Sequence, residues 1–467
     1  MQFNKAKLFR FWGRAETGKM MSESEWDLNY YWPRLVDICN KYKLEYNKEE
    51  VVPQDVEIAD NVFKAAYELL IDLGIYCQDT ERIIKIEADE LDEALRLFPS
   101  ETTIGEGKDA ITIKHRTMDD TTPPNVLARI LGPQDPDLLY KICLSYVLEP
   151  RIDHVHFQGI IPRIFGTPVK TGTPFEMAAE IRRRHIVNAA RRDGGRPGLH
   201  DGASATVTLQ GQLPAYDNRW GMRDGDASQV YIMPHLKTSY EQMSRTYACH
   251  ALGKNLWGLG QAFVGGLAGS PMHAAVVCTA ELLAYVSLYQ PTYLGIWPAD
   301  AIYFSTTSRS ALFCNFYCGL AWSRNTNTFA VTGNPWGIVC AGPCTEEYFW
   351  EHAAGNIGNV NVGLNCAGGT GWQSGQVNGA CGIGARFSHE VGCAGLGLGL
   401  KEANRMVNEC LEKYEKSMIE RTLHKIGKPF QECYDTESCE PTKEHTDVYN
   451  SVKNKLRDMG LTGLGPF

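Results

Sequence analysis

The sequence predicts an α/β protein built on a (β/α)₈ barrel, the TIM-barrel fold, and three observations support this class. From about residue 125 onward, short apolar runs alternate with longer segments of helical periodicity, as in a parallel sheet whose strands are joined by helices. Eight such runs are expected, which is the number of strands that a (β/α)₈ barrel requires. The chain of 467 residues also exceeds the roughly 250 residues of a barrel, so added segments are expected at its ends.

The expected strands are short and apolar, and they cover 126–132, 154–160, 196–202, 230–235, 263–266, 301–305, 328–332 and 360–366. Helical periodicity between them predicts helices at 137–148, 174–192, 239–253, 273–288, 309–322 and 345–357. A doubly wound open sheet is the alternative fold. It is less favoured because no GxGxxG turn opens the first unit.

Three regions are expected along the chain. Residues 1–124 form an N-terminal helical extension with small strands, which includes a helix at 56–73 bounded by Pro53 and Gly74. Residues 125–385 form the barrel. Residues 386–467 form a C-terminal helical region that packs on the barrel, with a long helix expected at 388–416.

Composition excludes several classes of protein. A net charge of −9 argues against a nucleic-acid binder, because phosphate neutralisation requires clustered Lys and Arg. The first residues lack the apolar core of a signal peptide, and the 15 cysteines form no CxxC pair, so a cytoplasmic protein with reduced thiols is expected. The uncharged run between Lys254 and Glu281 is interrupted by glycines, which favours a buried strand, loop and helix over a membrane span.

A barrel places its site at the carboxyl ends of its strands, and this rule selects candidate residues. They are His154, His156, Gln158, His200, Asp201, His235, Lys237, Met272, His273, Tyr303, Ser305, Asn334, Trp336, Asn365 and Trp372. The rule does not decide which chemistry they carry out.

Three interpretations of this set compete. Four histidines and a carboxylate (His154, His156, His200, His235 and Asp201) could surround a hydrolytic Zn²⁺, although no tight spacing enforces tetrahedral ligation. Cys340 and Cys344 open a helix and could form a thiolate site. The aromatic faces of Tyr303, Trp336 and Trp372 near Asp201 would suit an ammonium ion. We predict that no metal is held at the barrel mouth.

Five blocks carry a resemblance to a known family: GIYCQDTERI (74–83), GRPG (195–198), GGLAG (265–269), CAGPCTE (340–346) and FQECYD (430–435). In this order, and over nearly the whole chain, they resemble blocks of the monomethylamine:corrinoid methyltransferases. The resemblance implies a barrel, a homo-oligomer such as a hexamer, and methyl transfer from an amine to Co(I). It also implies a corrinoid protein as partner, which supplies the corrinoid (cobalamin), with no cofactor bound tightly to this chain.

The resemblance also points to a departure in the site. In that family a pyrrolysine follows the GRPG block and captures the amine. Asp201 stands at that position here, and His200 is the alternative because the alignment needs a one-residue gap. Asp201 and His200 are therefore the expected catalytic residues. The expected substrate-binding residues are His156, His235, Met272, Tyr303, Asn334, Trp336 and Trp372.

Segments 270–273 and 334–338 are more apolar and aromatic than their counterparts in the family. They predict a small-molecule N-methyl substrate that is larger than a primary amine and permanently charged, such as a quaternary amine, held without pyrrolysine by aromatic faces and a carboxylate. Asp201 is accordingly expected to face the cavity near Trp336, and an ordinary Asp-Gly turn is the competing interpretation. A Zn²⁺-dependent methyltransferase or hydrolase and a catalytically silent homologue remain the alternatives for function.

Overall fold

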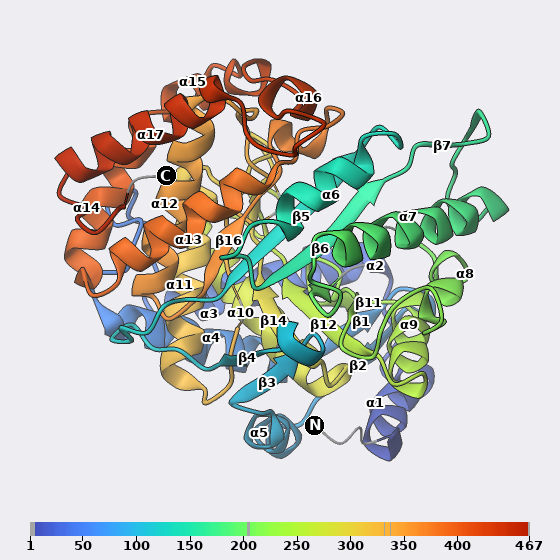
Figure 1. Ribbon diagram of the computed structural model, residues 1–467. Coiled ribbons are helices and arrows are strands. Elements are labelled where there is room, and N and C mark those ends of the chain that lie inside the picture. Colours follow the sequence, from blue (N-terminus) through green and yellow to red (C-terminus); the bar gives the residue numbers. More distant parts are fainter. Residues whose placement is uncertain (1–4, 203–205, 331, 337, 466–467) are drawn as a thin grey trace.

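A computed structural model describes residues 5–202, 206–330, 332–336 and 338–465 (Figure 1). Two parallel sheets lie at its centre. One has the order β16-β5-β6-β9 and the other the order β10-β12-β14. Their strands are β5 (Val126–Pro133), β6 (His154–Ile160), β9 (His200–Asp201), β10 (Ala227–Gln229), β12 (Asn255–Gly260), β14 (Tyr293–Ile296) and β16 (Cys366–Gly368).

Isolated parallel bridges continue the pairing between the two sheets. Leu294 of β14 pairs with Ala330, and Thr332 pairs with Asn365, next to β16. Between β9 and β10 the links involve side chains: the Asp201 backbone N–H donates to Asp226 Oδ1 at 2.9 Å. The predicted α/β class with parallel strands is confirmed, whereas closure into a barrel stays a prediction.

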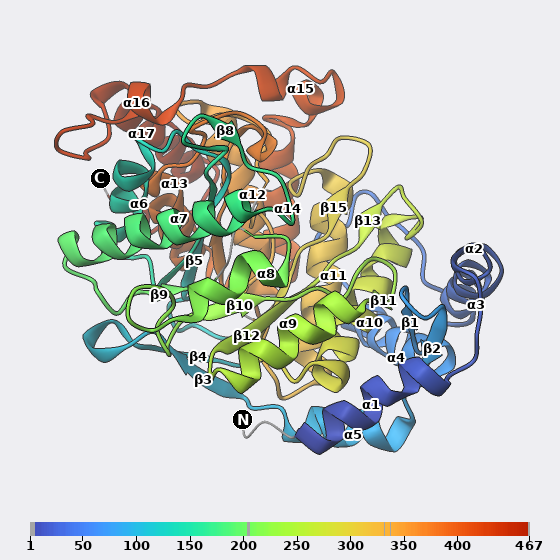
Figure 2. The same ribbon diagram turned by 90° about the vertical axis from the view of Figure 1, so that its right-hand side faces the viewer.

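Six helices between the strands are confirmed within a few residues of the predicted positions. They are α6 (Leu139–Val147), α7 (Pro174–Asp193), α9 (Tyr240–Ala251), α10 (Pro271–Leu288), α11 (Arg309–Asn325) and α12 (Glu346–Asn361). Ser239, Ser270, Ser308 and Thr345 cap four of them by accepting backbone N–H groups. Figure 2 shows α7, the short α8 (Leu209–Gln212) and α9 in front of β9, β10 and β12.

Helix α10 is long and apolar enough to cross a membrane, with a mean hydropathy of 1.4. In the described part of the chain it is the one such helix, and 94% of its residues are buried inside the protein. It packs against α4 and α11. This is the environment of a core helix, and it accounts for the long uncharged run in the sequence.

Several expected strands were placed wrongly. The strands expected at 230–235, 263–266 and 301–305 begin earlier, at Ala227, Asn255 and Tyr293, and only the two-residue strands β13 (Phe263–Val264) and β15 (Ala299–Asp300) lie near the expected places. The strand expected at 360–366 starts at Cys366, because α12 extends to Asn361. These strands are short, buried and glycine-containing, so neither alternation nor length distinguishes them from neighbouring loops.

Segments from both ends of the chain pack around the centre (Figure 1). The N-terminal ones are α1 (Lys5–Thr17), α2 (Glu23–Glu25), η1 (Trp26–Tyr31), α3 (Trp32–Lys41), α4 (Val56–Leu73), β1 (Ile75–Cys77), β2 (Arg82–Ile84), α5 (Ala88–Leu97), β3 (Glu101–Ile104), η2 (Gly107–Asp109) and β4 (Ile111–Lys114). The helix predicted at 56–73 is confirmed as α4. Strand β1 pairs in parallel with β11 (Lys237–Thr238), which joins this extension to the centre.

The C-terminal region holds α13 (Gly382–Gly395), α14 (Gly399–Leu411), α15 (Glu415–Ile419), η5 (Leu423–Lys425), α16 (Phe430–Cys433) and α17 (Lys443–Asp458). The single helix expected at 388–416 is wrong. Gly397 and Gly399 both adopt a positive φ of 76°, and this left-handed backbone separates α13 from α14. The remaining short elements are β7 (Arg163–Ile164), β8 (Thr167–Pro168), η3 (Leu213–Tyr216) and η4 (Trp372–Ser374).

Close packing of β12 against α10 yields a test of the fold. A Cβ atom at Gly258 would lie 2.1 Å from the Tyr285 ring, whose hydroxyl donates to the Val230 carbonyl. We expect Gly258→Ala to lower the free energy of unfolding by about 1–3 kcal/mol through overpacking. Gly13→Ala is the control, because its Cβ meets nothing within 4 Å in α1, and helix propensity predicts a gain of about 0.5–1 kcal/mol. Urea unfolding measures both, and an unchanged Gly258→Ala variant would contradict this packing.

Candidate functional site

A cavity of about 520 Å³ lies at the carboxyl ends of β5, β6 and β10, and we call it the strand-end pocket. Its lining comes from β5 and β6, from the segments that follow β9 and β10, and from the first turns of α9 with its capping residue. The lining residues are Arg129, Leu131, Gln158, Ile160, Thr206, Val207, Tyr231, Met233, Ser239, Glu241, Gln242 and Arg245. A volume of this size suits a small organic substrate.

A chain of polar side chains crosses the base of the pocket. Arg129 Nε donates to Gln158 Oε1 at 2.6 Å, and Gln158 Nε2 donates to Gln229 Oε1 at 2.8 Å. The guanidinium carbon of Arg129 lies 4.9 Å from the centre of the Trp336 ring. Burial lowers the pKa of Arg129 to about 10, so the group remains a cation near neutral pH.

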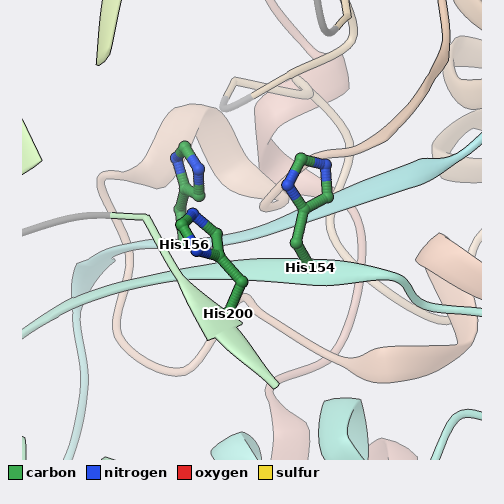
Figure 3. Close-up of side chains that lie close together, drawn as sticks. All are labelled: His154, His156 and His200. Atoms are coloured by element: carbon green, nitrogen blue, oxygen red, sulfur yellow. The ribbon is translucent and has the colours of Figure 1, made fainter. Parts of the chain in front are cut away.

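Three buried histidines meet beside this base, and we call them the histidine cluster: His154, His156 and His200 (Figure 3). His154 and His156 are two residues apart on β6 and so share one face, and His154 pairs with His200 on β9. One ring nitrogen from each lies within 4.8 Å of the others. Next to the cluster, the His156 ring packs 4.4 Å from Trp257 and 5.0 Å from Trp336.

Hydrogen bonds and burial make the histidine cluster neutral. The His200 Nδ1–H donates to the Gly225 carbonyl at 2.6 Å, because a carbonyl can only accept, and His200 Nε2 then accepts from the Tyr293 hydroxyl at 2.8 Å. Tyr293 Oη also lies 3.2 Å from His156 Nε2. Burial lowers the pKa of each of the three histidines below its ordinary value.

Glycine is required beside the cluster. A Cβ at Gly202 would lie 1.9 Å from His156 Nε2, and the Gly202 carbonyl accepts a hydrogen bond from the Trp257 indole. The Asp-Gly pair that the sequence offered as a possible turn therefore serves close packing inside the sheet.

The position predicted for the Asp201 side chain is wrong. Successive residues of β9 point to opposite faces, so His200 points inward and Asp201 points outward to α7. The Asp201 carboxylate is fully buried, forms an ion pair with Arg184 and accepts the Phe157 backbone N–H at 3.2 Å. Glu180 also pairs with Arg184, at 2.9 Å. Asp201 thus neither faces the cavity near Trp336 nor sits in an exposed turn.

The other predicted residues are dispersed. His156, His200 and Trp336 come together, but His235 packs 5.4 Å from Tyr31 and takes no part in the histidine cluster. Tyr303 lines two other cavities, of about 210 and 320 Å³.

Three more of the predicted substrate-binding residues also lie outside the strand-end pocket. Trp372 Nε1 donates to the Ile426 carbonyl at 2.8 Å, and Asn334 Nδ2 donates to the Pro298 carbonyl at 2.8 Å. Met272 is buried in the first turn of α10. At the predicted thiolate site, burial raises the pKa of the Cys340 thiol, whereas a hydrogen bond with Cys433 lowers the pKa of Cys344, so Cys340 is not favoured as a thiolate.

Sequence reasoning missed Arg129, Gln229 and Tyr231. One signal was present: Arg129 is the single charged residue of the otherwise apolar strand Val126–Pro133. A charge is placed in such a strand only where a partner or a ligand compensates it. Gln229 and Tyr231 were missed because strand β10 was expected too late in the chain.

Comparison with known proteins decides the family. A family model described as monomethylamine methyltransferase MtmB matches residues 6–461. The chain belongs to the monomethylamine methyltransferase family. It is 29% identical to monomethylamine methyltransferase MtmB1 of Methanosarcina barkeri over 467 residues, which cover 99% of this chain and 100% of that relative. It is 28% identical to MtmB of Methanosarcina mazei with the same coverage.

Solved structures of the monomethylamine methyltransferase family agree. The crystal structure of the Methanosarcina barkeri enzyme superposes with a TM-score of 0.91 at 27% identity, covering 97% of this chain and 98% of the other. A second solved structure, described as the hydroxylamine MtmB complex, gives the same values. The predicted membership is confirmed, and the chain is a methyltransferase.

The buried ion pair of Asp201 predicts a structural role. Asp201→Ala would leave the Arg184 guanidinium buried with one carboxylate fewer, and we expect a loss of about 3–5 kcal/mol in the free energy of unfolding. Glu101→Ala is the control, because Glu101 pairs with Lys114 on the surface, and it should cost no more than about 1 kcal/mol. Urea unfolding followed by circular dichroism compares them, and equal losses would refute the role of Asp201.

Proposed function

We propose that this chain moves a methyl group from a cationic N-methylated amine, such as a quaternary amine, to Co(I) of a corrinoid protein, without pyrrolysine. One observation carries the proposal. The two residues aligned with the pyrrolysine position are both engaged, His200 with Gly225 and Tyr293 and Asp201 with Arg184, so neither is available to capture an amine. A substrate held by non-covalent contacts in the strand-end pocket is the alternative that this arrangement supports.

The strand-end pocket can carry out the protein's part of this reaction. When bound, the partner's corrinoid supplies a Co(I) nucleophile that takes the methyl carbon, while the C–N electron pair stays on the departing nitrogen. The chain must align the C–N bond and exclude water. Tyr231 offers an aromatic face and Glu241 a carboxylate, both suited to a cationic nitrogen. A quaternary substrate leaves as a neutral amine and requires no proton donor.

The rim of the pocket suits a protein partner that carries the corrinoid. Ile160 and Val207 line the pocket and are exposed by 42% and 62%. Phe165 is fully exposed, and it lies between β7 and β8 in the hairpin that follows β6; Figure 1 labels β7 of this hairpin. Exposed apolar side chains around an opening are typical of a docking surface.

Three broader features belong to the same proposal. The links between β9 and β10 through Asp201, Asp226, His200 and Gly225 would close the eight parallel segments into a (β/α)₈ barrel. Assembly into a homo-oligomer follows from the resemblance to the family. A cytoplasmic location is the expectation from composition.

The histidine cluster favours a metal-dependent methyltransferase or hydrolase as the second candidate. His200 donates its second ring N–H to a backbone carbonyl, as zinc-bound histidines commonly do, and the three ring nitrogens are close together. However, Tyr293 Oη already lies within hydrogen-bond distance of two of them. Asp201 and His235, which were considered as further ligands, lie elsewhere. We keep the prediction that function requires no metal in this cluster.

A methyl-transfer assay tests the proposed function. The full-length protein is mixed with a free Co(I) corrinoid and, separately, with tetramethylammonium, choline, N,N,N-trimethylglycine or monomethylamine. We expect loss of the Co(I) absorbance with at least one quaternary compound and none with monomethylamine, because the chain lacks a residue to capture a primary amine. Transfer from monomethylamine, or from none of the four, would count against the proposal.

The same assay distinguishes the proposed function from the metal-dependent alternative. Activity should survive chelation, and metal analysis should find no stoichiometric zinc in the purified protein. Zinc lost together with activity would favour the metal-dependent alternative.

The docking surface predicts a selective kinetic defect. Phe165→Asn should raise the KM for a corrinoid protein about tenfold, because a fully exposed aromatic anchor is lost. Transfer to a free corrinoid should not change. Leu252→Asn is the control, since Leu252 is half exposed at the far end of α9, before β12. Equal KM values for Phe165→Asn and the control would place the partner elsewhere.

A further inference from the structure

We infer that the methyl donor carries a carboxylate, which binds the guanidinium of Arg129 at the base of the strand-end pocket. This inference rests on the proposed function and narrows its substrate to N-methylated amino acids and betaines. The donor would be a zwitterion, with its carboxylate at the base of the pocket and its N-methyl group toward the opening.

Arg129 is a buried cation without a counter-ion among the residues that the structure describes. Its side chain lines the pocket, only 4% of the residue is exposed, and Nη1 has no hydrogen-bond partner in the described chain. Its Nε donates to the neutral amide oxygen of Gln158. Burying a charge without compensation is unfavourable, so such a group is expected to meet an anion when the site is filled.

The other buried arginines that the structure describes either pair with a carboxylate or donate hydrogen bonds from both Nη atoms. Arg183 pairs with Glu180 at 2.7 Å, and Arg191 pairs with Asp226 at 2.8 Å. Arg245, which also lines the pocket, donates to the carbonyls of Val207 and Gln229 at 2.8 and 3.2 Å. Arg191 and Arg245 each leave a buried Nε without a partner among the described residues, but only Arg129 does so with an Nη atom and also has no carboxylate partner there.

The orientation of Arg129 is set for a planar anion. Trp336 lies under the guanidinium plane, while Gln158, itself held by Gln229, holds the Nε edge. A guanidinium fixed in this way presents its remaining N–H groups to a carboxylate in the paired geometry that these two groups favour. A hydroxyl or a methyl group in the same place would leave the charge uncompensated.

The rest of the pocket suits the cationic end of such a donor. Leu131, Ile160 and Tyr231 form apolar and aromatic walls, and the Glu241 carboxylate lies at the exposed start of α9. A donor anchored at Arg129 would direct its methylated nitrogen away from the base, toward the exposed rim at Val207. The methyl group would then face the partner.

Calorimetric titration of the full-length protein tests the inference with matched probes that differ only in the acid group. One pair is N,N,N-trimethylglycine and choline, and the other is trimethylated γ-aminobutyrate and its alcohol. The wild type should bind at least one acid roughly tenfold or more tightly than its alcohol, as expected for a charge-assisted hydrogen bond. Arg129→Gln should abolish this preference and leave alcohol binding unchanged within about twofold. Arg129→Lys should retain part of it.

Two controls accompany the titrations. Arg405→Gln, on the surface of α14, should leave all affinities unchanged. Thermal unfolding should show that Arg129→Gln keeps its Tm, because Arg129 forms no ion pair with the residues that the structure describes. If that variant unfolds, the comparison of acid and alcohol binding in the wild type and in Arg129→Lys still tests whether Arg129 binds the carboxylate.

The outcomes separate this inference from the proposed function. Equal binding of acid and alcohol, or no binding of either acid, overturns the inference. Acid binding that depends on Arg129 without methyl transfer upholds the carboxylate site at Arg129 and refutes the proposed function. Methyl transfer from the alcohols as fast as from the acids upholds the proposed function and overturns the inference.

Discussion

The arrangement of the site depends on buried ion pairs between α7 and the strands that it covers. Asp226 accepts from Arg191 at 2.8 Å and from the Asp201 backbone N–H at 2.9 Å, and so connects the helix, β9 and the start of β10. Burial alone would raise the pKa of Asp226, but Arg191 holds it below the ordinary value, and the carboxylate stays charged. These side-chain contacts join β9 to β10 where the described chain has no backbone ladder between them.

This join determines which way the residues of β9 point. With Asp201 anchored outward on Arg184, His200 must point inward to Tyr293. The outer layer therefore contains paired charges, whereas the inner layer contains neutral imidazoles and aromatic rings. Two cations, Arg129 and Arg245, line the strand-end pocket without an ion pair among the described residues, and of these two only Arg129 has an Nη atom without an acceptor there. The pocket therefore lacks the Asp201 carboxylate because this residue, in the short strand β9, points outward.

The helices were largely predictable from the sequence, but the face to which each residue of a strand points was not. Helices such as α4 and α12 carry local signals, namely apolar periodicity and the caps Asp55 and Thr345. Strand β9 is only two residues long, so no alternation could show which side chain faces inward, and a shift by one residue exchanges His200 with Asp201. The family blocks located the right dipeptide, but tertiary ion pairs with α7 decided its orientation.

The sequence pointed to Trp336 as a residue of the site, but the structure gives its ring a different contact from the one predicted. An aromatic residue at a strand end suggested a platform for the substrate's ammonium group. In the structure Trp336 packs against His156 and lies under the Arg129 guanidinium, so the cation beside its ring belongs to the protein. A ring that supports an arginine helps to hold an anion, which reverses the expected polarity at the base of the pocket. On the proposed function, the cationic end of the substrate would then lie farther out, beside Tyr231 and Glu241, where the partner would reach its methyl group.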